Sequence, residues 1–219
     1  MDAEVLVLAG APGSGKSSLG GALLQSRGLD YFAASDYARA VMSRSACSPD
    51  EALIEGWAEG HRRLRAAISS RRSFAIETSL GGVTVPRMIR EAAEAGLMVR
   101  VWFFGLDSLE LHLHRVRRRE IAGGLPAIES HVRTCWTRSR ENLIALLPAC
   151  TAVRLFDNSA ERTTNIETPA PRLIMDVRRP DWIRPFHQDL ASTPDWAKPI
   201  LESAIAHYGL PAKSPVRTS

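Results

Sequence analysis

A glycine-rich stretch near the N-terminus constrains this 219-residue chain more than any other feature. Residues 5–8 (VLVL) have the composition of a buried β-strand, and a sequence typical of a helix begins at Lys16. Between them, residues 10–17 read GAPGSGKS, which fits the P-loop pattern G-x-x-x-x-G-K-[ST]. A strand before this motif and a helix after it are the context that a P-loop requires, so we expect a strand–loop–helix unit here.

The residue types in this motif predict a nucleotide phosphate site. Glycines allow the backbone to turn its N–H groups inward, and the positive end of the following helix adds to the attraction for phosphate. Lys16 can reach the β- and γ-phosphates of ATP, and the Ser17 hydroxyl can bind Mg²⁺. The expected nucleotide-binding residues are Gly10, Ala11, Pro12, Gly13, Ser14, Gly15, Lys16, Ser17 and Ser18.

Composition indicates a globular protein rather than a membrane protein. Hydrophobic residues make up 45% of the chain and charged residues 24%, and the length suits one well-buried domain. No apolar run has the length of a membrane span and no signal peptide is visible, so we expect a cytoplasmic protein. Cys47, Cys135 and Cys150 lack C-x-x-C spacing, which predicts free thiols and no zinc site.

The charge balance is basic, with a formal net charge of +4, and all but three of the 28 basic residues are arginine. Arginine binds phosphate in a bidentate manner, so this balance suits a small anionic substrate. It would also suit nucleic acid. However, the basic residues concentrate in one central segment, and no alternation of aromatic and basic residues is present, which makes nucleic acid the less favoured partner.

Alternating apolar and helix-type segments predict a three-layer α/β fold of the P-loop NTPase/kinase type, with a mostly parallel five-stranded sheet and an arginine-rich helical lid. The expected strands are 5–8, 29–34, 74–76, 98–104 and 152–156; the expected helices are 15–27, 48–72, 85–95, one beginning at 107–108, and 128–147. We assign residues 1–160 to the core, with a lid at about 112–135. Residues 161–211 form an extension packed on the core, with a possible edge strand at 172–175 and a last helix at 196–208. Residues 212–219 are an expected disordered tail.

Two acidic residues follow predicted strands and should lie at the carboxyl edge of the sheet, on the P-loop side. Asp36 can deprotonate or orient an acceptor hydroxyl, or hold Mg²⁺ through water; a helix N-cap is the alternative role. Glu77, with Thr78, can face the acceptor, and a salt bridge to an arginine is the alternative. Arg39, one turn after Asp36, can face the same crevice or solvent.

A run of arginines in the central segment forms the predicted lid. Arg115, Arg118 and Arg119 are spaced i, i+3, i+4 and therefore share one face of a helix. The flexible pair Gly123-Gly124 follows them, as in a segment that closes over a triphosphate. A solvated basic helix face is the alternative.

Two classes of P-loop protein fit the sequence poorly. No N-K-x-D guanine motif is present, which argues against a GTPase. Motor ATPases need a strand ending in an acid that aims a water, and the nearest equivalent, Glu77, is followed by Thr-Ser-Leu-Gly-Gly. A compact kinase of a small acceptor is the remaining class, because phosphoryl transfer depends mainly on positioning and charge neutralisation.

An ordered series of motifs over roughly residues 4–160 resembles the zeta-toxin family of P-loop kinases. The series comprises GAPGSGKSS, the D-x-x-R of Asp36 and Arg39, E-T-S-L from Glu77, RVRRREIAGG, R-S-x-x-N-L from Arg138, and D-N-S from Asp157. The resemblance implies ATP/Mg²⁺-dependent phosphorylation of a sugar hydroxyl of UDP-N-acetylglucosamine, often by the toxin of a toxin–antitoxin pair.

Carried over by position, the resemblance assigns a role to each matching residue. Lys16 and Ser17 would bind ATP and Mg²⁺, Asp36 would be the base, and Glu77 and Thr78 would hold the acceptor. Arg115 or Arg118, with a later arginine such as Arg133, would clamp the phosphates; Arg39 and Arg119 complete the expected substrate-binding set.

The sequence departs from the family pattern at two places, Gly123-Gly124-Leu125-Pro126 in the lid and Thr134-Cys135-Trp136, where an arginine is replaced. Another metabolite, an antibiotic or a nucleic-acid end is therefore an alternative acceptor. A non-catalytic nucleotide-binding partner protein is the alternative outside the enzymes.

Overall fold

The computed structural model describes residues 3–18, 29–160, 170–179, 181–184 and 187–209. In this part of the chain a seven-stranded sheet has the order β2-β3-β1-β4-β5-β6-β7. The strands are β1 (Glu4–Ala9), β2 (Tyr31–Phe32), β3 (Phe74–Thr78), β4 (Met98–Gly105), β5 (Ala152–Asp157), β6 (Arg172–Arg178) and β7 (Asp181–Arg184). Strands β1 to β5 pair in parallel, whereas β6 and β7 are antiparallel.

The helices lie between the strands, as the sequence pattern predicts. They are α2 (Ala34–Met42), α3 (Pro49–Ser69), α4 (Thr84–Glu94), α5 (Leu109–Ile121), α6 (Glu129–Leu146) and α7 (Lys198–Tyr208), with 3₁₀ turns η1 (Leu147–Ala149), η2 (His187–Ser192) and η3 (Asp195–Ala197). Residues 16–18 are helical directly after the P-loop; the remainder of the helix expected at 15–27 lies outside the described residues. None of the described helices is long and apolar enough to span a membrane.

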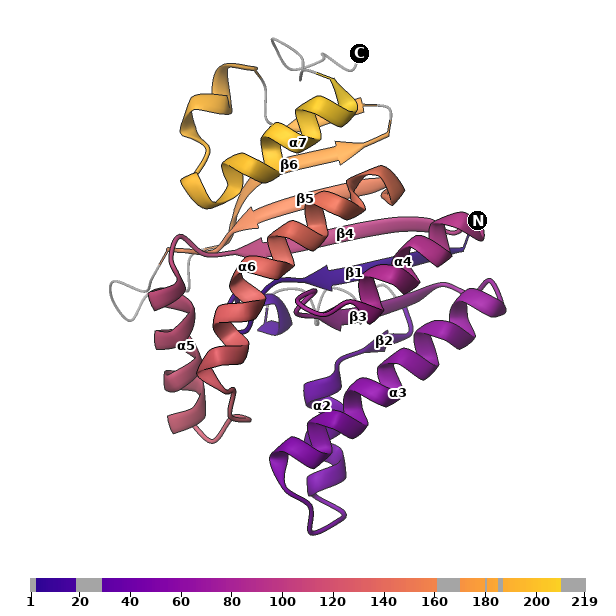
Figure 1. The fold of residues 1–219 in the computed structure, drawn as a ribbon, viewed down its shortest axis with the longest axis vertical. Helices are drawn as coiled ribbons and strands as arrows, with labels where there is room; N and C mark the ends of the chain where they lie inside the picture. The colour runs from indigo at the N-terminus through magenta and orange to yellow at the C-terminus, as the bar shows by residue number, and fades with distance from the viewer. Residues whose placement is uncertain (1–2, 19–28, 161–169, 180, 185–186, 210–219) are drawn as a thin grey trace.

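The main core lies between one face of the sheet and four helices. Alternate residues of β1, β4 and β5 pack there against α3, α4, α6 and α7, which Figure 1 shows together on the near side of the strands. Among the largest buried side chains are Phe74, Phe103, Leu64, Met88, Ile89, Leu143 and Leu146. Figure 1 places α5 beyond the carboxyl ends of the strands, next to the lower end of α6. The parallel strands therefore direct their carboxyl ends toward α5.

Several predicted boundaries differ from the structure. The sheet has seven strands rather than five, because the predicted edge segment 172–175 extends to Arg178 and β7 pairs beyond it. The expected strand 29–34 shortens to Tyr31–Phe32, because α2 begins at Ala34. At that point the chain packs closely on α3: a Cβ on Gly56 would lie 2.6 Å from the Ala34 carbonyl oxygen. Close helix packing has overridden local strand propensity.

The start of α3 follows its sequence signature. Ser48 is the N-cap, and its hydroxyl accepts a hydrogen bond from the Glu51 N–H, while the Glu51 carboxylate accepts one from the Ser48 N–H. This reciprocal capping box satisfies two N–H groups that the helix itself cannot.

The C-terminal segment packs on the core through η3 and α7. Trp196, Ile200, Leu201 and Ala204 join the main hydrophobic core, and the expected helix 196–208 begins with the 3₁₀ turn. The predicted disordered tail, 212–219, lies outside the described residues.

Candidate nucleotide and acceptor site

Three glycines of the P-loop, Gly10, Gly13 and Gly15, have positive φ angles, which favour glycine over other residues. Gly10 and Gly13 have φ angles of +145° and +85°. A Cβ on Gly10 would lie 2.3 Å from the Phe104 carbonyl oxygen, and one on Gly13 would lie 2.7 Å from that of His112. The loop is thus pressed against the end of β4 and against α5, and these contacts fix its path.

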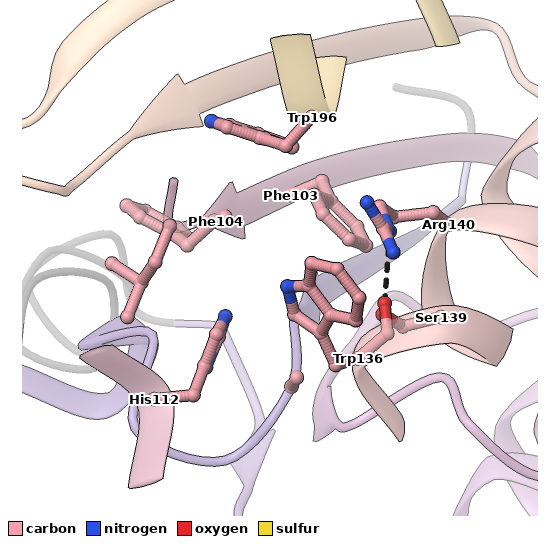
Figure 2. Close-up of a pocket in the computed structure, with 10 residues that line it drawn as sticks. Phe103, Phe104, His112, Trp136, Ser139, Arg140 and Trp196 are labelled. Atoms are coloured by element: carbon pink, nitrogen blue, oxygen red, sulfur yellow. Dashed lines mark hydrogen bonds between the residues drawn. The ribbon is translucent and has the colours of Figure 1, made fainter. Parts of the chain in front are cut away.

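Side chains from two other elements hold the carbonyl groups of the loop. His112 of α5 lies with Nδ1 2.7 Å from the Pro12 carbonyl oxygen, and Asn158, after β5, donates through Nδ2 to the Ser14 oxygen at 2.9 Å. Since a carbonyl oxygen can only accept, the His112 tautomer that makes this bond carries its proton on Nδ1. Figure 2 shows His112 and Trp136 among the residues that line one small cavity. Two side chains remote in sequence therefore fix the path of the loop.

Burial keeps His112 neutral. Its side chain lies among aromatic residues, and this desolvation lowers its pKa to about 4, while the hydrogen bond to Pro12 acts in the opposite direction. The positive charges of Lys16 and Arg115 lower the pKa further. A neutral imidazole adds no charge beside the phosphate loop.

Lys16 and Glu77 form the charged centre of the site. Lys16 Nζ lies 3.8 Å from Glu77 Oε1, and that oxygen also accepts a hydrogen bond of 2.8 Å from the Ser17 hydroxyl. The second oxygen of Glu77 accepts a hydrogen bond of 2.8 Å from Tyr31 on β2. Burial lowers the pKa of Lys16, and the charge of Glu77 opposes that shift. Burial, followed by the charge of Glu77, raises the pKa of Tyr31, so this phenol remains a donor.

The oxygen atoms of Ser17 and Glu77 suit Mg²⁺. Mg²⁺ prefers hard oxygen ligands and is usually held by one or two protein side chains, with waters and substrate phosphates completing the shell. A hydroxyl and a carboxylate in contact at the end of a P-loop fit this requirement. The described residues contain no group of three or more His, Cys, Asp or Glu side chains placed to hold a metal ion.

Asp36 and Arg39 lie on the first turns of α2 and form an ion pair, with side chains 56% and 58% exposed. Asp36 is not the N-cap, a position that Ala33 occupies without a side-chain hydrogen bond. The charge of Asp36 contributes to the raised pKa of Tyr31, the residue that donates a hydrogen bond to Glu77.

Thr78 has a local structural contact. Its hydroxyl accepts a hydrogen bond of 3.0 Å from the Leu80 N–H and shapes the turn after β3, where Leu80 takes a φ of +57°. The Glu77 carboxylate lies against the P-loop, where Ser17 and Tyr31 both donate hydrogen bonds to it.

The structure separates the predicted lid arginines. Arg115 donates to the carbonyl oxygens of Asn158 (2.8 Å) and Ala160 (3.1 Å), so it holds the loop after β5. Arg118 is exposed to solvent. Arg133 pairs with Glu129 at 2.7 Å, one turn earlier on α6.

Arg119 is the lid arginine whose charge acts on the P-loop. It donates to the Leu125 oxygen at 3.0 Å, and its positive charge contributes to the lowered pKa of Lys16. Burial lowers the pKa of Arg119 itself, and the charge of Arg39 lowers it further. The charge of Arg119, an exposed residue, therefore acts on both Lys16 and Arg39.

Sequence reasoning assigned no role to several residues of the site. Tyr31, His112 and Asn158 contact the P-loop or Glu77 from three different elements. Asn158 belongs to the D-N-S motif, which was a detectable signal, whereas a single Tyr in a short strand or a single His on a helix carries none. A further pair, Trp57 of α3 and His131 of α6, lies with ring centroids 6.0 Å apart.

Comparison with known proteins rests on structure. No protein-family model and no curated protein sequence matches this chain. Among solved structures, the AvrRxo1-ORF1:AvrRxo1-ORF2 complex, determined with sulphate ions and with ATP, matches with a TM-score of 0.59 and 14% identity over 100% of this chain and 66% of that chain. The PezAT chromosomal toxin–antitoxin system of Streptococcus pneumoniae matches with a TM-score of 0.53 and 13% identity, over 77% of this chain and 75% of that chain.

The chain shares its α/β fold with these two solved structures. The mostly parallel α/β architecture predicted from the sequence is confirmed, with more strands than expected. The chain spans slightly less than two thirds of the AvrRxo1 chain that it matches.

Proposed function

We propose that this protein is an ATP-dependent phosphotransferase that moves the γ-phosphate to a hydroxyl group of a small anionic acceptor. The observation that carries the proposal is the contact of Lys16 and Ser17, at the end of the P-loop, with Glu77. A protein that binds nucleotide only to control its association with a partner needs no general base. Here the exposed carboxylate of Asp36 is available to act as one.

The P-loop and Lys16 bind the nucleotide. The backbone N–H groups of residues 13–17 and the start of the following helix attract the phosphates, and the Lys16 ammonium balances charge on the transferred group. Mg²⁺, when bound, would neutralise charge on the β- and γ-phosphates. Ser17 and Glu77 are the residues that would hold it, and Tyr31 keeps the Glu77 carboxylate in place.

Asp36 is the proposed base. Its carboxylate is accessible at the start of α2 and accepts the proton of the acceptor hydroxyl as that oxygen attacks the γ-phosphorus. Arg39, paired with Asp36, orients the carboxylate and attracts the negative charge of the acceptor. In this proposal Glu77 acts on the nucleotide and its Mg²⁺, whereas the resemblance implies a role in binding the acceptor.

Arg119 is the proposed lid residue that stabilises charge during transfer. It is the arginine of the run whose charge acts on Lys16, Glu77 and Arg39 together. Arg115 supports the loop after β5, whereas Arg133 is engaged by Glu129, and neither arrangement points to a phosphate clamp.

The first acceptor to test is UDP-N-acetylglucosamine, because the zeta-toxin resemblance implies it and its diphosphate suits Arg39 and Arg119. We further propose a protein partner that regulates the enzyme, because both structural relatives were determined as complexes or as a toxin–antitoxin system. A small acidic protein encoded next to this chain would be the first candidate, since the chain is basic.

The deciding experiment is transfer of the γ-phosphate from labelled ATP to UDP-N-acetylglucosamine and to a panel of hydroxylated metabolites. We expect transfer by the native chain, loss in Lys16→Ala with loss of ATP binding, and loss in Asp36→Asn with ATP binding retained. Arg87→Gln, an exposed change on α4, is the control. Tight ATP binding without transfer to any acceptor, and no effect of Asp36→Asn, would overturn the proposal in favour of a non-catalytic partner protein.

A further inference from the structure

On the sheet face opposite α3, α4, α6 and α7, strands β4, β5 and β6 carry arginines, whereas Leu6 and Leu8 of β1 and Trp102 of β4 are buried. The strand register aligns two rows of residues across β1, β4, β5 and β6 on this face. The first row is Leu6, Arg100, Ala152 and Arg178; the second is Leu8, Trp102, Arg154 and Asp176. Strands of a parallel sheet are normally apolar on both faces because helices cover both. Three guanidinium groups on adjacent strands are unsuited to such a covering.

A cavity of about 350 Å³ lies over these two rows. The residues that line it are Leu6, Arg100, Trp102, Thr151, Ala152, Arg154, Asp176, Arg178 and Arg179. The lining therefore contains four arginines and one carboxylate. Its volume falls at the small end of the range for small-molecule sites.

Carboxylates hold the arginines in defined positions. Asp176, only 3% exposed, accepts hydrogen bonds from Arg154 Nε at 2.9 Å and from Arg178 Nη2 at 3.3 Å. Arg154 also lies over the Trp102 ring, with its central carbon 5.6 Å from the ring centroid. Arg100 Nε lies 3.1 Å from Glu4 Oε2 at the outer end of β1. Immobilised guanidinium groups lose little further entropy when a ligand binds.

The arginines retain donors beyond these contacts. A guanidinium has five N–H donors, and Arg154 and Arg100 use Nε for the contacts just described. The Arg179 guanidinium donates to the Pro148 oxygen at 2.6 Å and lies over the Tyr208 ring. Arg179 nevertheless lines the cavity, so its positive charge adds to that of the other three arginines. The cavity therefore offers a concentrated positive charge with unused, planar donors.

We propose that this cavity is a second anion site, which binds the phosphate group of a small phosphorylated molecule through Arg100, Arg154 and Arg178. Planar guanidinium groups match phosphate oxygens in geometry and charge. The site is separate from the P-loop: Leu6 precedes Gly10 by four residues, which is about 13 Å along an extended strand. It goes beyond the proposed kinase function and does not depend on it.

The test uses the full chain carrying Lys16→Ala, which removes the principal phosphate ligand of the P-loop. Pyrophosphate and a nucleoside monophosphate are titrated separately by calorimetry. We expect one molecule bound per chain, and binding at least tenfold weaker when Arg100→Gln and Arg178→Gln are added, because two charge-assisted contacts are lost. Tighter binding of the nucleoside monophosphate would identify an organic phosphate as the ligand, and tighter binding of pyrophosphate an inorganic one.

The control is Arg87→Gln in the same Lys16→Ala background, which removes one exposed arginine far from the cavity and should leave binding unchanged. The double change keeps Arg154 beside Asp176, so the buried carboxylate retains its partner, and circular dichroism checks the fold. Absence of binding by the Lys16→Ala chain would overturn the proposal. Binding that is unaffected by the two arginine changes would overturn it equally.

Discussion

His112 Nδ1 lies 2.7 Å from the carbonyl oxygen of Pro12, so helix α5 is hydrogen-bonded directly to the phosphate loop. The imidazole is 2% exposed, and the backbone of the same residue packs against Gly13. One residue of α5 therefore contacts the P-loop through both its side chain and its main chain. We interpret His112 as a positioning residue that fixes the loop before ATP arrives.

Replacing His112 should change ATP binding more than turnover. His112→Phe keeps an aromatic ring but loses the donor, and we expect the KM for ATP to rise about threefold to tenfold, the equivalent of one net hydrogen bond. Because His112 does not touch the substrate, kcat should change less than KM. His112→Asn can restore a donor near Nδ1 and should recover most of the affinity. Equal affinities of the two variants would contradict the positioning role, and steady-state kinetics measures both parameters.

Protonation of His112 should destabilise the fold in acid. Its pKa in the folded state is about 4, below the ordinary value of 6.5, so the unfolded chain binds the proton first. The stability that His112 contributes is present above pH 6.5 and is lost as the pH falls from about 6.5 to 4, by roughly 3 kcal/mol in total. Urea unfolding at a series of pH values should show a smaller loss over this window for His112→Asn than for the native chain. Identical slopes would contradict the assignment.

Glu77 should govern the requirement for Mg²⁺. Glu77→Gln keeps the side-chain shape but removes the charge beside Ser17 and Lys16, so we expect the Mg²⁺ concentration for half-maximal activity to rise about tenfold to a hundredfold. Glu55→Gln is a matched control, because Glu55 accepts a hydrogen bond from Tyr37 on the exposed side of α3. An unchanged Mg²⁺ dependence in Glu77→Gln would contradict the role in Mg²⁺ binding and favour a role in binding the acceptor.

Arg119 and Arg133 offer a matched pair in the lid. Arg119→Gln should lower kcat by about a hundredfold, because it removes a positive charge that acts on the phosphate centre. Arg133→Gln should change kcat less than threefold, since that guanidinium is engaged by Glu129 on the surface of α6. The two rates, measured at saturating ATP and acceptor, separate the assignments; a larger effect at Arg133 would reverse them.

Trp196 couples the C-terminal segment to the end of β4. It is 5% exposed, and a Cβ on Gly105 would lie 2.3 Å from its ring. Gly105→Ala should lower the free energy of unfolding by about 1–3 kcal/mol through overpacking. Trp196→Leu should also destabilise by leaving a cavity, but the double variant should lose less than the sum, because the smaller side chain makes room. If the losses of unfolding free energy in the two single variants add up in the double variant, the two residues are not coupled by a packing contact.

Sequence patterns predicted most of the architecture because local signals agreed with the tertiary packing. The capping box at Ser48, the apolar run of β4 and the turn at Gly96 each mark an element that the structure contains. The strand before α2 was predicted too long. Local strand propensity carries no information about the close packing of the start of α2, at Ala34, against Gly56 of α3. The strand β7 was missed because its pairing depends on β6, far from any strong periodic signal.

The sequence alone determined the phosphate loop, since the glycine spacing and the lysine–serine pair lie within eight consecutive residues and their geometry is local. Tertiary structure decided which other residues serve that loop. Three arginines on one helix look equivalent in sequence, but their surroundings differ. Arg115 donates a hydrogen bond to the loop after β5, Arg118 is exposed to solvent, and the charge of Arg119 lowers the pKa of Lys16. Glu77 likewise acquires its partners only when β2, β3 and the P-loop come together. The physical reason is that hydrogen bonds and charge interactions act over a few ångströms, and only folding sets the distances between segments remote in sequence.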